Sequence, residues 1–250
     1  MSARIDFNCD LGEGGDDAAL LPCLSSASIA CGFHAGDPAS MQRTVALCCK
    51  YGVAIGAHPS LFDREGFGRR ELPITADQAY ALTLYQVGAL QALVRAVGGC
   101  LRHVKPHGAL YNLSAHDPGL ADAIARAVYD ADSRLILYGL ANSKSTAAGE
   151  RLGLRVAHEV FAERRYEADG RLTPRGMPGA VIETLEESLT QVRQLLREGC
   201  VTARTGERLM LRADTLCLHG DRPDAVAFAR SLRLALQDEG IEVLAVGANE

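Results

Sequence analysis

Residues 104–112, with the sequence VKPHGALYN, begin as a predicted strand and end in a glycine-containing turn. Lys105 and His107 are two residues apart, so their side chains point to the same face of an extended chain. Pro106 between them lacks a backbone donor and excludes a helix at this point. Because a cation and an imidazole are costly to bury without partners, this strand end is a candidate site. The structural alternative is a hydrogen-bonded core histidine beside a lysine that reaches the surface.

Strand-like and helix-like segments alternate on both sides of this stretch. The predicted strands cover residues 4–9, 28–32, 53–57, 100–107, 134–139, 154–161, 215–221 and 241–246. The predicted helices cover residues 38–51, 76–97, 118–131, 145–152, 182–197 and 223–238, and residues 201–211 form a hairpin around Thr205 and Gly206. Seven or eight strands in this order predict an α/β protein with a parallel sheet. The short connections and the 250-residue length favour a TIM-like barrel, with residues 1–250 as one domain.

Composition narrows the functional classes. The net charge of −5 argues against a nucleic-acid surface. No apolar run approaches the roughly 20 residues that span a bilayer, and the N-terminal residues show no apolar signal core, so we expect a cytoplasmic protein without a membrane anchor. The eight cysteines include no C-x-x-C pair, and we expect them to be buried, reduced thiols.

Ionisable residues gather where the predicted strands end. In parallel barrels the active site lies at the carboxyl ends of the strands. Those ends carry Asn8, Asp10, His34, His58, Lys105, His107, Glu159, His219 and Asp221. Two long polar loops add Arg64, Arg69, Arg70, Arg164 and Arg165 to the same rim, and a solvated loop explains about half of these arginines. The pattern predicts a polar catalytic mouth.

Two chemistries fit this mouth. Asp10, His34 and His58 could hold a divalent metal that activates water. Alternatively, a carboxylate or imidazole acts as general base and Lys105 or an arginine stabilises an oxyanion, without a metal. Because the three metal candidates lie on separate elements and form no compact motif, we favour activity without a tightly bound transition metal. No G-x-S-x-G elbow and no G-x-x-x-x-G-K-[ST] phosphate loop occurs in the sequence.

Seven sequence blocks resemble one known family when they are taken in order. They are DFNCDLGEG, IACGFHAGDP, IGAHPS, GFGRR, HVKPHGALYN, EVFAERRY and LCLHGD, between about residues 5 and 243. Together they resemble the LamB/YcsF family. Two positions depart from its pattern, because Ser28 stands where asparagine is usual and Glu163 replaces an aspartate. Both changes are conservative, and they affect the fine geometry of the site and not the expected function.

The resemblance implies a barrel of the glycoside hydrolase/deacetylase type. It also implies one subunit of an ATP-dependent 5-oxoprolinase, which opens 5-oxoproline (pyroglutamate) to L-glutamate together with subunits B and C. Since this sequence has no recognisable nucleotide loop, we expect ATP to be bound mainly by the partner subunits. A stand-alone metal-dependent deacetylase or amidase acting on a sugar or small amide is the alternative enzyme class, and a non-catalytic binding subunit is a third reading.

The expected site residues follow from residue chemistry and from position within the family's blocks. The expected catalytic residues are Asp10, His58, Lys105 and His107. The expected substrate-binding residues are His34, Arg69, Glu159, Arg164, His219 and Asp221. Arginines and a lysine suit an anionic substrate that carries carboxylate and phosphate groups.

Overall fold

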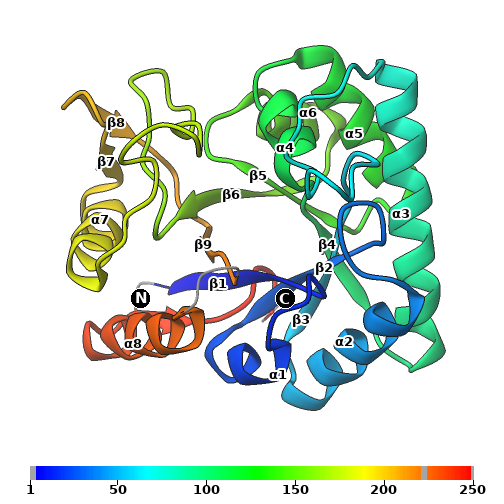
Figure 1. Ribbon diagram of the computed structural model, residues 1–250, viewed down its shortest axis with the longest axis horizontal. Helices are drawn as coiled ribbons and strands as arrows, with labels where there is room; N and C mark the ends of the chain where they lie inside the picture. Colours follow the sequence, from blue (N-terminus) through cyan, green and yellow to red (C-terminus); the bar gives the residue numbers. More distant parts are fainter. Residues whose placement is uncertain (1–3, 221–223, 249–250) are drawn as a thin grey trace.

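Seven parallel strands close into a barrel in the computed structural model, which describes residues 4–220 and 224–248 (Figure 1). In barrel order the strands are β1 (Arg4–Leu11), β2 (Ser26–Ala30), β3 (Ala54–His58), β4 (Leu101–Val104), β5 (Ile136–Leu140), β6 (Arg155–Phe161) and β9 (Thr215–Leu218). Parallel pairing between β1 and β9, from Asp6 opposite Thr215 to Cys9 opposite Leu218, closes the ring. The predicted TIM-like α/β barrel is therefore confirmed.

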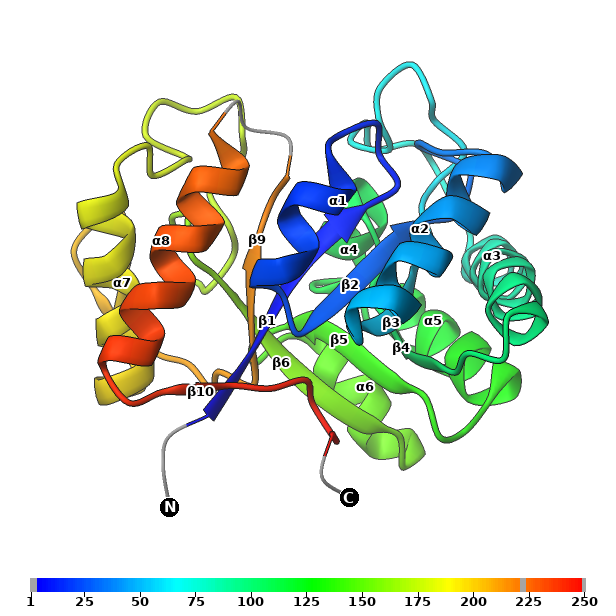
Figure 2. The ribbon, with the colours of Figure 1, turned by 90° about the horizontal axis from the view of Figure 1, so that it is seen from below.

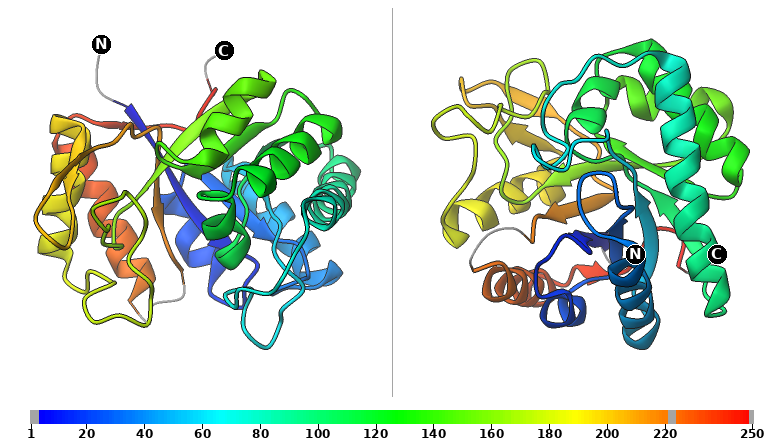
Figure 3. Two further views of the ribbon diagram at one scale, coloured as in Figure 1. Left: turned by 90° about the horizontal axis from the view of Figure 1, so that it is seen from above. Right: turned by 45° about the vertical axis from the view of Figure 1, so that its right-hand side comes forward.

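Helices surround the barrel strands on the outside (Figures 1 and 2). They are α1 (Asp17–Leu20), the 3-10 turn η1 (Leu21–Cys23), α2 (Pro38–Tyr51), α3 (Ala76–Ala96), α4 (Gly108–Ser114), α5 (Pro118–Ala131), α6 (Lys144–Leu152), α7 (Leu185–Glu198) and α8 (Ala225–Asp238). The long loops after β3 and β6, residues 59–75 and 162–184, lie at the same end of the barrel (Figure 3). That end is where the carboxyl ends of the strands lie. Within the described residues, no helix has both the length and the apolar character needed to span a lipid bilayer.

Capping residues explain why several helix limits agree with the sequence prediction. The Asp37 side chain accepts a hydrogen bond from the backbone N–H of Ser40, and Pro38 opens α2. Gly52 ends that helix with φ of 69°, a left-handed conformation that suits glycine. In the same way the Asp117 side chain accepts bonds from the first turn of α5.

Three local features differ from or refine the predicted elements. Helix α4 was not predicted, because Pro106 and Gly108 suggested a turn, whereas the helix begins at Gly108 immediately after the extended residues. The last strand, β10 (Glu242–Val243), is shorter than predicted and pairs with Arg4 and Ile5 at the start of β1, outside the closed ring. The predicted hairpin is present as antiparallel β7 (Cys200–Thr202) and β8 (Arg208–Met210).

Two of the eight cysteines contradict the expectation of burial. All eight are free thiols, but Cys49 and Cys100 are exposed. Cys49 lies near the end of α2 and Cys100 precedes β4, so both fall at helix or strand ends instead of in the core. The other six are buried, in agreement with the prediction.

The barrel interior is polar, whereas the layer between strands and helices is apolar. Along β1, Asp6, Asn8 and Asp10 share one face and the apolar residues share the other. Asp6 accepts hydrogen bonds from Tyr138 (3.1 Å) and Thr215 (2.5 Å), and Asn8 donates to Thr215 (2.7 Å). These hydrogen-bonded polar groups lie along the barrel axis below Asp10 and form the base of the site.

His103 of β4 lies in this interior, and its burial predicts how the stability of the fold depends on pH. It is fully buried, its Nε2 lies 3.2 Å from the Ser28 hydroxyl, and its ring stacks on Tyr138. Burial, reinforced by the Lys105 charge, lowers the pKa of His103 to about 3. The unfolded chain therefore protonates this imidazole near pH 6.5 while the folded protein does not. The resulting stability is complete above pH 6.5 and is lost as the pH falls toward 3.

We expect the wild type to lose roughly 2 kcal/mol more unfolding free energy than a His103→Gln variant between pH 7 and pH 5. Urea unfolding of both proteins at the two pH values measures this difference. Contributions from the other titrating groups are common to both proteins and cancel. Equal losses in the two proteins would show that His103 titrates normally in the folded state.

Candidate active site

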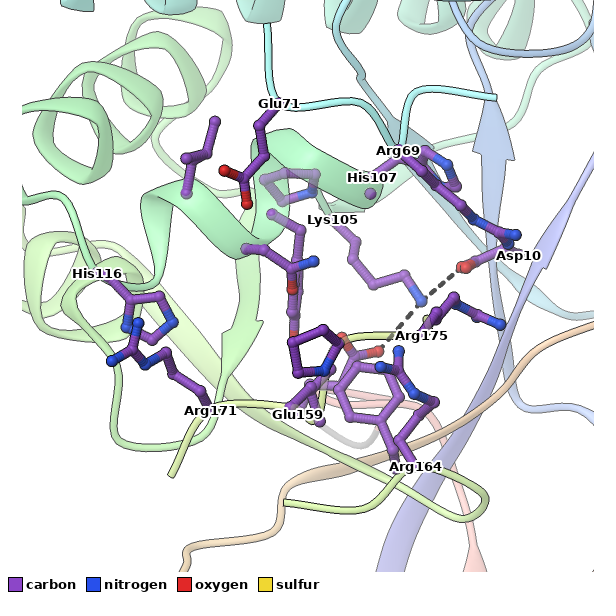
Figure 4. A pocket seen from close by; sticks show the side chains of 18 of the residues that line it. Asp10, Arg69, Glu71, Lys105, His107, His116, Glu159, Arg164, Arg171 and Arg175 are labelled. Carbon is purple, nitrogen blue, oxygen red and sulfur yellow. Dashed lines mark hydrogen bonds and ion pairs between the residues drawn. The ribbon is translucent and has the colours of Figure 1, made fainter. Parts of the chain in front are cut away.

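The carboxyl ends of the strands surround a pocket of about 680 Å³ (Figure 4). The expected residues that line it are Asp10, His58, Arg69, Lys105, His107, Glu159, Arg164 and His219. Side chains that are far apart in the sequence therefore meet in one pocket, as their positions at strand ends predicted. His34 does not line this pocket but lies behind it, with its ring stacked on His107 at 3.8 Å between centroids. Asp221 lies outside the described residues.

Lys105 lies at the centre of the site and is only 2% exposed. Its Nζ lies 2.5 Å from Asp10 Oδ1 and 3.1 Å from Glu159 Oε1. It also donates a hydrogen bond to Asn8 Oδ1 at 2.8 Å. Figure 4 shows the ammonium group between the two carboxylates, which come from β1 and β6, the two neighbours of β9 in the barrel. The geometry is that of a buried ion-pair network.

The charges of this network stabilise one another. Burial disfavours the ammonium form of Lys105, but the charge of Asp10 and other nearby groups outweighs it, and the pKa of Lys105 stays well above its ordinary value. Burial likewise raises the pKa of Asp10, but His58 and Lys105 outweigh burial and hold that pKa well below its ordinary value. Asp10 is therefore a carboxylate and Lys105 a cation in the folded protein.

Three histidines and one glutamate form a second cluster beside the lysine. His107 Nδ1 lies 2.9 Å from His58 Nε2, and His58 Nε2 lies 3.3 Å from Asp10 Oδ2. Glu13 Oε1 lies 2.7 Å from His34 Nε2 and 3.5 Å from His107 Nδ1. Burial lowers the pKa of His107 well below its ordinary value, and burial also lowers the pKa of His34. Both imidazoles are neutral near pH 7.

The loop after β3 packs closely against these histidines at two glycines, one in the loop and one at the start of α4. Gly68 has φ of 67°, and a Cβ there would collide with the Ser60 hydroxyl. A Cβ on Gly108 would collide with the carbonyl oxygen of Gly68. The loop itself is held by Asp63, whose carboxylate accepts from the Gly66 backbone N–H at 3.0 Å. Close backbone approach at this point therefore requires glycine.

The five rim arginines divide into two groups. In the first group, Arg64 donates hydrogen bonds to the carbonyls of Gly32 and Gly36. Arg70 is paired with Asp63, and Arg165 Nη2 lies 3.5 Å from Glu187 Oε1. These three arginines therefore have structural contacts away from the pocket. Arg69 and Arg164 line the pocket, and so do Arg171 and Arg175. The labelled side chains of Arg69, Arg164 and Arg175 lie on the same side as Asp10, whereas Arg171 lies across the pocket (Figure 4).

Arg164 is fixed in place within this rim. It is 5% exposed, and its Nη2 donates to the Thr173 carbonyl at 2.6 Å. Burial, reinforced by Arg175, lowers its pKa to about 10, so the guanidinium is still charged at neutral pH. His219 is also positioned, because its Nδ1 lies 2.6 Å from Glu163 Oε1, the residue that replaces the family's aspartate.

Several residues of the site were not predicted as site residues. Glu13 lies within the acid-rich loop after β1, but nothing in the sequence distinguishes it from its acidic neighbours. Asn8 was recognised only as a strand-end residue, although it bridges Lys105 and Glu159. Tyr111 lines the pocket from the unpredicted helix α4. Each became recognisable only when the loops and α4 were placed in space.

Two groups of side chains have the composition and spacing to hold a metal ion among the described residues. One contains Glu13, His34, His58 and His107, and the other contains Asp10, Cys217 and His219, in each case with ligand atoms within 4.8 Å of one another. The sequence suggested Asp10, His34 and His58 as one set. The structure keeps the two histidines together and groups Asp10 with Cys217 and His219 instead, and Lys105 binds Asp10 Oδ1.

Fold and site together define a class, an α/β barrel with a buried acid–base cluster at the carboxyl end of its strands. The chain belongs to the LamB/YcsF family, whose model matches residues 5–250. A Bordetella pertussis protein, named as the A subunit of 5-oxoprolinase, is 53% identical over 251 residues, which cover 98% of this chain and 100% of that relative.

One solved structure agrees with this assignment, and a second has a similar fold. The lactam utilization protein from Thermus thermophilus is 44% identical, with a TM-score of 0.90 over 97% of this chain and 99% of that chain. The T48 deacetylase, solved with substrate, is 15% identical with a TM-score of 0.50, over 98% and 89% of the two chains. The second likeness concerns the fold alone, and it confirms the expected deacetylase-type barrel.

Proposed function

We propose that this chain is the A subunit of an ATP-dependent 5-oxoprolinase, a hydrolase that opens the cyclic amide 5-oxoproline to L-glutamate together with subunits B and C. The observation that carries the proposal is the 53% identity over the whole length of a relative with that name. The 44% identical lactam utilization protein supports the same substrate class. The buried Lys105 cluster supports a hydrolytic role for this subunit within the complex.

The chemistry of the substrate explains why more than one subunit is needed. A five-membered lactam is a stable amide, and its opening has to be coupled to ATP. The sequence of this chain contains no G-x-x-x-x-G-K-[ST] loop, so in our proposal a partner subunit binds ATP and phosphorylates the lactam oxygen. This chain then receives the activated ring.

Ring opening in the pocket needs proton transfer and stabilisation of negative charge. Water adds to the activated carbonyl carbon, the ring C–N bond breaks, and the nitrogen takes up the protons that the water releases. The resulting acyl phosphate is hydrolysed by a second water to glutamate and phosphate. We assign to Lys105 the stabilisation of the negative charge that develops on oxygen. We assign activation of the water to the cluster of Glu13, His34, His58 and His107, whose polar atoms lie close together.

The rim supplies the charges that the activated substrate requires. A phosphorylated lactam carries a phosphate and a carboxylate, and arginine binds both groups in bidentate fashion. Arg69 and Arg164 line the pocket beside the Lys105 network. We assign them to substrate binding, together with His219, whose imidazole is oriented by Glu163.

We expect that the purified chain alone neither hydrolyses ATP nor forms glutamate from 5-oxoproline, and that glutamate forms when subunits B and C and ATP are added. The assay measures ADP and glutamate in the same samples. Omission of this chain from the complete mixture is the control and is expected to abolish glutamate formation. ATP-dependent glutamate formation by B and C alone would contradict the proposal.

A stand-alone deacetylase or amidase is the second candidate, and the metal-capable cluster favours it. The two candidates differ in their need for ATP. Release of acetate or ammonia from small amides by this chain alone, without ATP or partners, would support the second candidate over the first.

A further inference from the structure

Four side chains from four separate elements surround one point at the barrel mouth. Glu13 comes from the loop after β1, His34 from the loop after β2, His58 from the end of β3, and His107 from the residue before α4. The three histidines are each at most 4% exposed, and the Glu13 side chain is 13% exposed. The four residues are therefore almost fully withdrawn from solvent, with Glu13 nearest to it.

Backbone carbonyls fix which imidazole nitrogens carry hydrogen. His58 Nδ1 lies 2.6 Å from the carbonyl oxygen of Lys105, and His107 Nε2 lies 2.9 Å from that of Phe67. Since a carbonyl oxygen only accepts, both of these nitrogens must be donors. In the neutral rings, the lone pairs of His58 Nε2 and His107 Nδ1 then face each other across 2.9 Å. Two lone pairs at this distance repel each other unless a cation or a proton lies between them.

The carboxylate of Glu13 adds a negative charge to the same point. Its Oε1 lies 3.8 Å from His58 Nε2, 3.5 Å from His107 Nδ1 and 2.7 Å from His34 Nε2. Three imidazoles and one carboxylate, with two of the imidazoles oriented by hydrogen bonds from their other nitrogens, are typical of a protein metal site.

We propose that Glu13, His34, His58 and His107 form a binding site for a divalent transition-metal cation of the zinc type. The donor set decides the class of ion, because imidazole nitrogen suits Zn²⁺ and its neighbours, whereas Mg²⁺ and Ca²⁺ require mainly oxygen ligands. The site accounts for the opposed lone pairs of His58 and His107 and for the convergence of the carboxylate on them.

The alternative group of Asp10, Cys217 and His219 does not suit a cation. The Lys105 ammonium lies 2.5 Å from Asp10 Oδ1 and 3.4 Å from Cys217 Sγ, so a positive charge already lies within that group. The proposed site also has a route to solvent, because Glu13 and Phe67 line a second pocket of about 260 Å³ on the side of the β1 loop. A metal ion can therefore reach the cluster without displacing Lys105.

The test measures metal binding by the isolated chain, without substrate, partners or ATP, so its failure would leave the proposed oxoprolinase function standing. A chelator first removes any metal from the protein, and a reductant keeps its cysteines reduced. Zn²⁺ binding is then measured by calorimetric titration, and the bound metal per chain is determined after dialysis. Co²⁺ is then added in place of Zn²⁺, since its visible absorption reports nitrogen and oxygen ligands. We expect stoichiometric Zn²⁺ binding, a higher thermal midpoint, and a Co²⁺ spectrum without thiolate charge-transfer bands.

Two ligand variants and one matched histidine variant complete the test. Glu13→Gln and His58→Gln are each expected to weaken Zn²⁺ binding on the order of 100-fold or more, since even groups that only orient a ligand typically contribute 10- to 100-fold. Glu13 lies in a partly exposed loop, so its variant is expected to fold even if His58→Gln does not. His116→Gln changes an exposed histidine outside the cluster and is expected to bind Zn²⁺ as the wild type does.

Two results would overturn the proposal. One is the absence of saturable Zn²⁺ or Co²⁺ binding by the folded wild type, which would indicate that a shared proton separates His58 and His107. The other is unchanged binding in a folded Glu13→Gln variant, which would assign the metal to other groups such as the exposed thiols of Cys49 and Cys100.

Discussion

Replacing Lys105 by methionine is expected to lower glutamate formation by the assembled complex by ~10²-fold or more, because it removes the charge that stabilises the developing oxyanion. The partners' ATP hydrolysis is expected to continue at least in part, since activation of the lactam takes place outside this subunit. The variant also leaves Asp10 and Glu159 without their shared cation in a buried site. Loss of one partner from a buried ion pair typically costs about 3–5 kcal/mol, so stability has to be measured alongside activity.

Two further variants separate catalysis from folding in this experiment. Lys50→Met removes an exposed lysine at the end of α2, far from the barrel mouth, and is expected to keep the wild-type rate. The double variant Lys105→Met/Asp10→Asn removes one positive and one negative charge and is expected to recover stability but not activity. Recovery of activity in the double variant would show that Lys105 serves the fold and not the reaction.

His107→Ala is the second variant with a large expected effect, again a loss of glutamate formation of ~10²-fold or more. The ring stacks on His34, faces His58 at 2.9 Å and bonds to the Phe67 carbonyl, so its removal disrupts the whole histidine cluster. The rates of ADP and glutamate formation are measured on the purified complex after its assembly has been checked.

The matched control for this variant is His116→Ala, which removes an exposed histidine that lines the opposite wall of the same pocket, outside the histidine cluster (Figure 4). Its glutamate rate is expected to stay close to that of the wild type. If a folded, assembled His107→Ala complex also formed glutamate at the wild-type rate, residues 104–112 would have only a structural role and our site assignment would be wrong.

The sequence predicted most of the fold because its local signals agree with one another. Capping residues and stop signals such as Asp37, Pro38 and Gly52 explain why the predicted limits of α2 agree with the structure, and the alternation of apolar and polar residues along β1 is typical of a strand. The prediction failed where contacts with the rest of the fold decide the local secondary structure. Helix α4 begins directly at a glycine that looks like a turn, and β10 pairs at the foot of β1 instead of joining the barrel.

The site was predictable only to the extent that topology fixes it. Parallel strands bring their carboxyl ends together, so the meeting of Asp10, His58, Lys105 and His107 followed from strand order alone. Loop conformation does not follow from strand order, which is why Glu13 was missed. The lack of a compact ligand motif does not decide whether a metal binds, because the four candidate ligands come from four elements. Activity without a tightly bound metal, which the sequence favoured, stays a prediction, and the zinc titration tests metal binding alone.

In our proposal this chain opens a ring that its partners have activated. The first turnover of the Lys105→Met complex tests this division of labour, with ADP and glutamate measured after rapid mixing with ATP and 5-oxoproline. We expect an ADP burst stoichiometric with the complex and no matching glutamate, whereas the wild type forms both together. If neither product forms in the folded variant complex, Lys105 is needed before or during ATP use, and the proposed division of labour is contradicted.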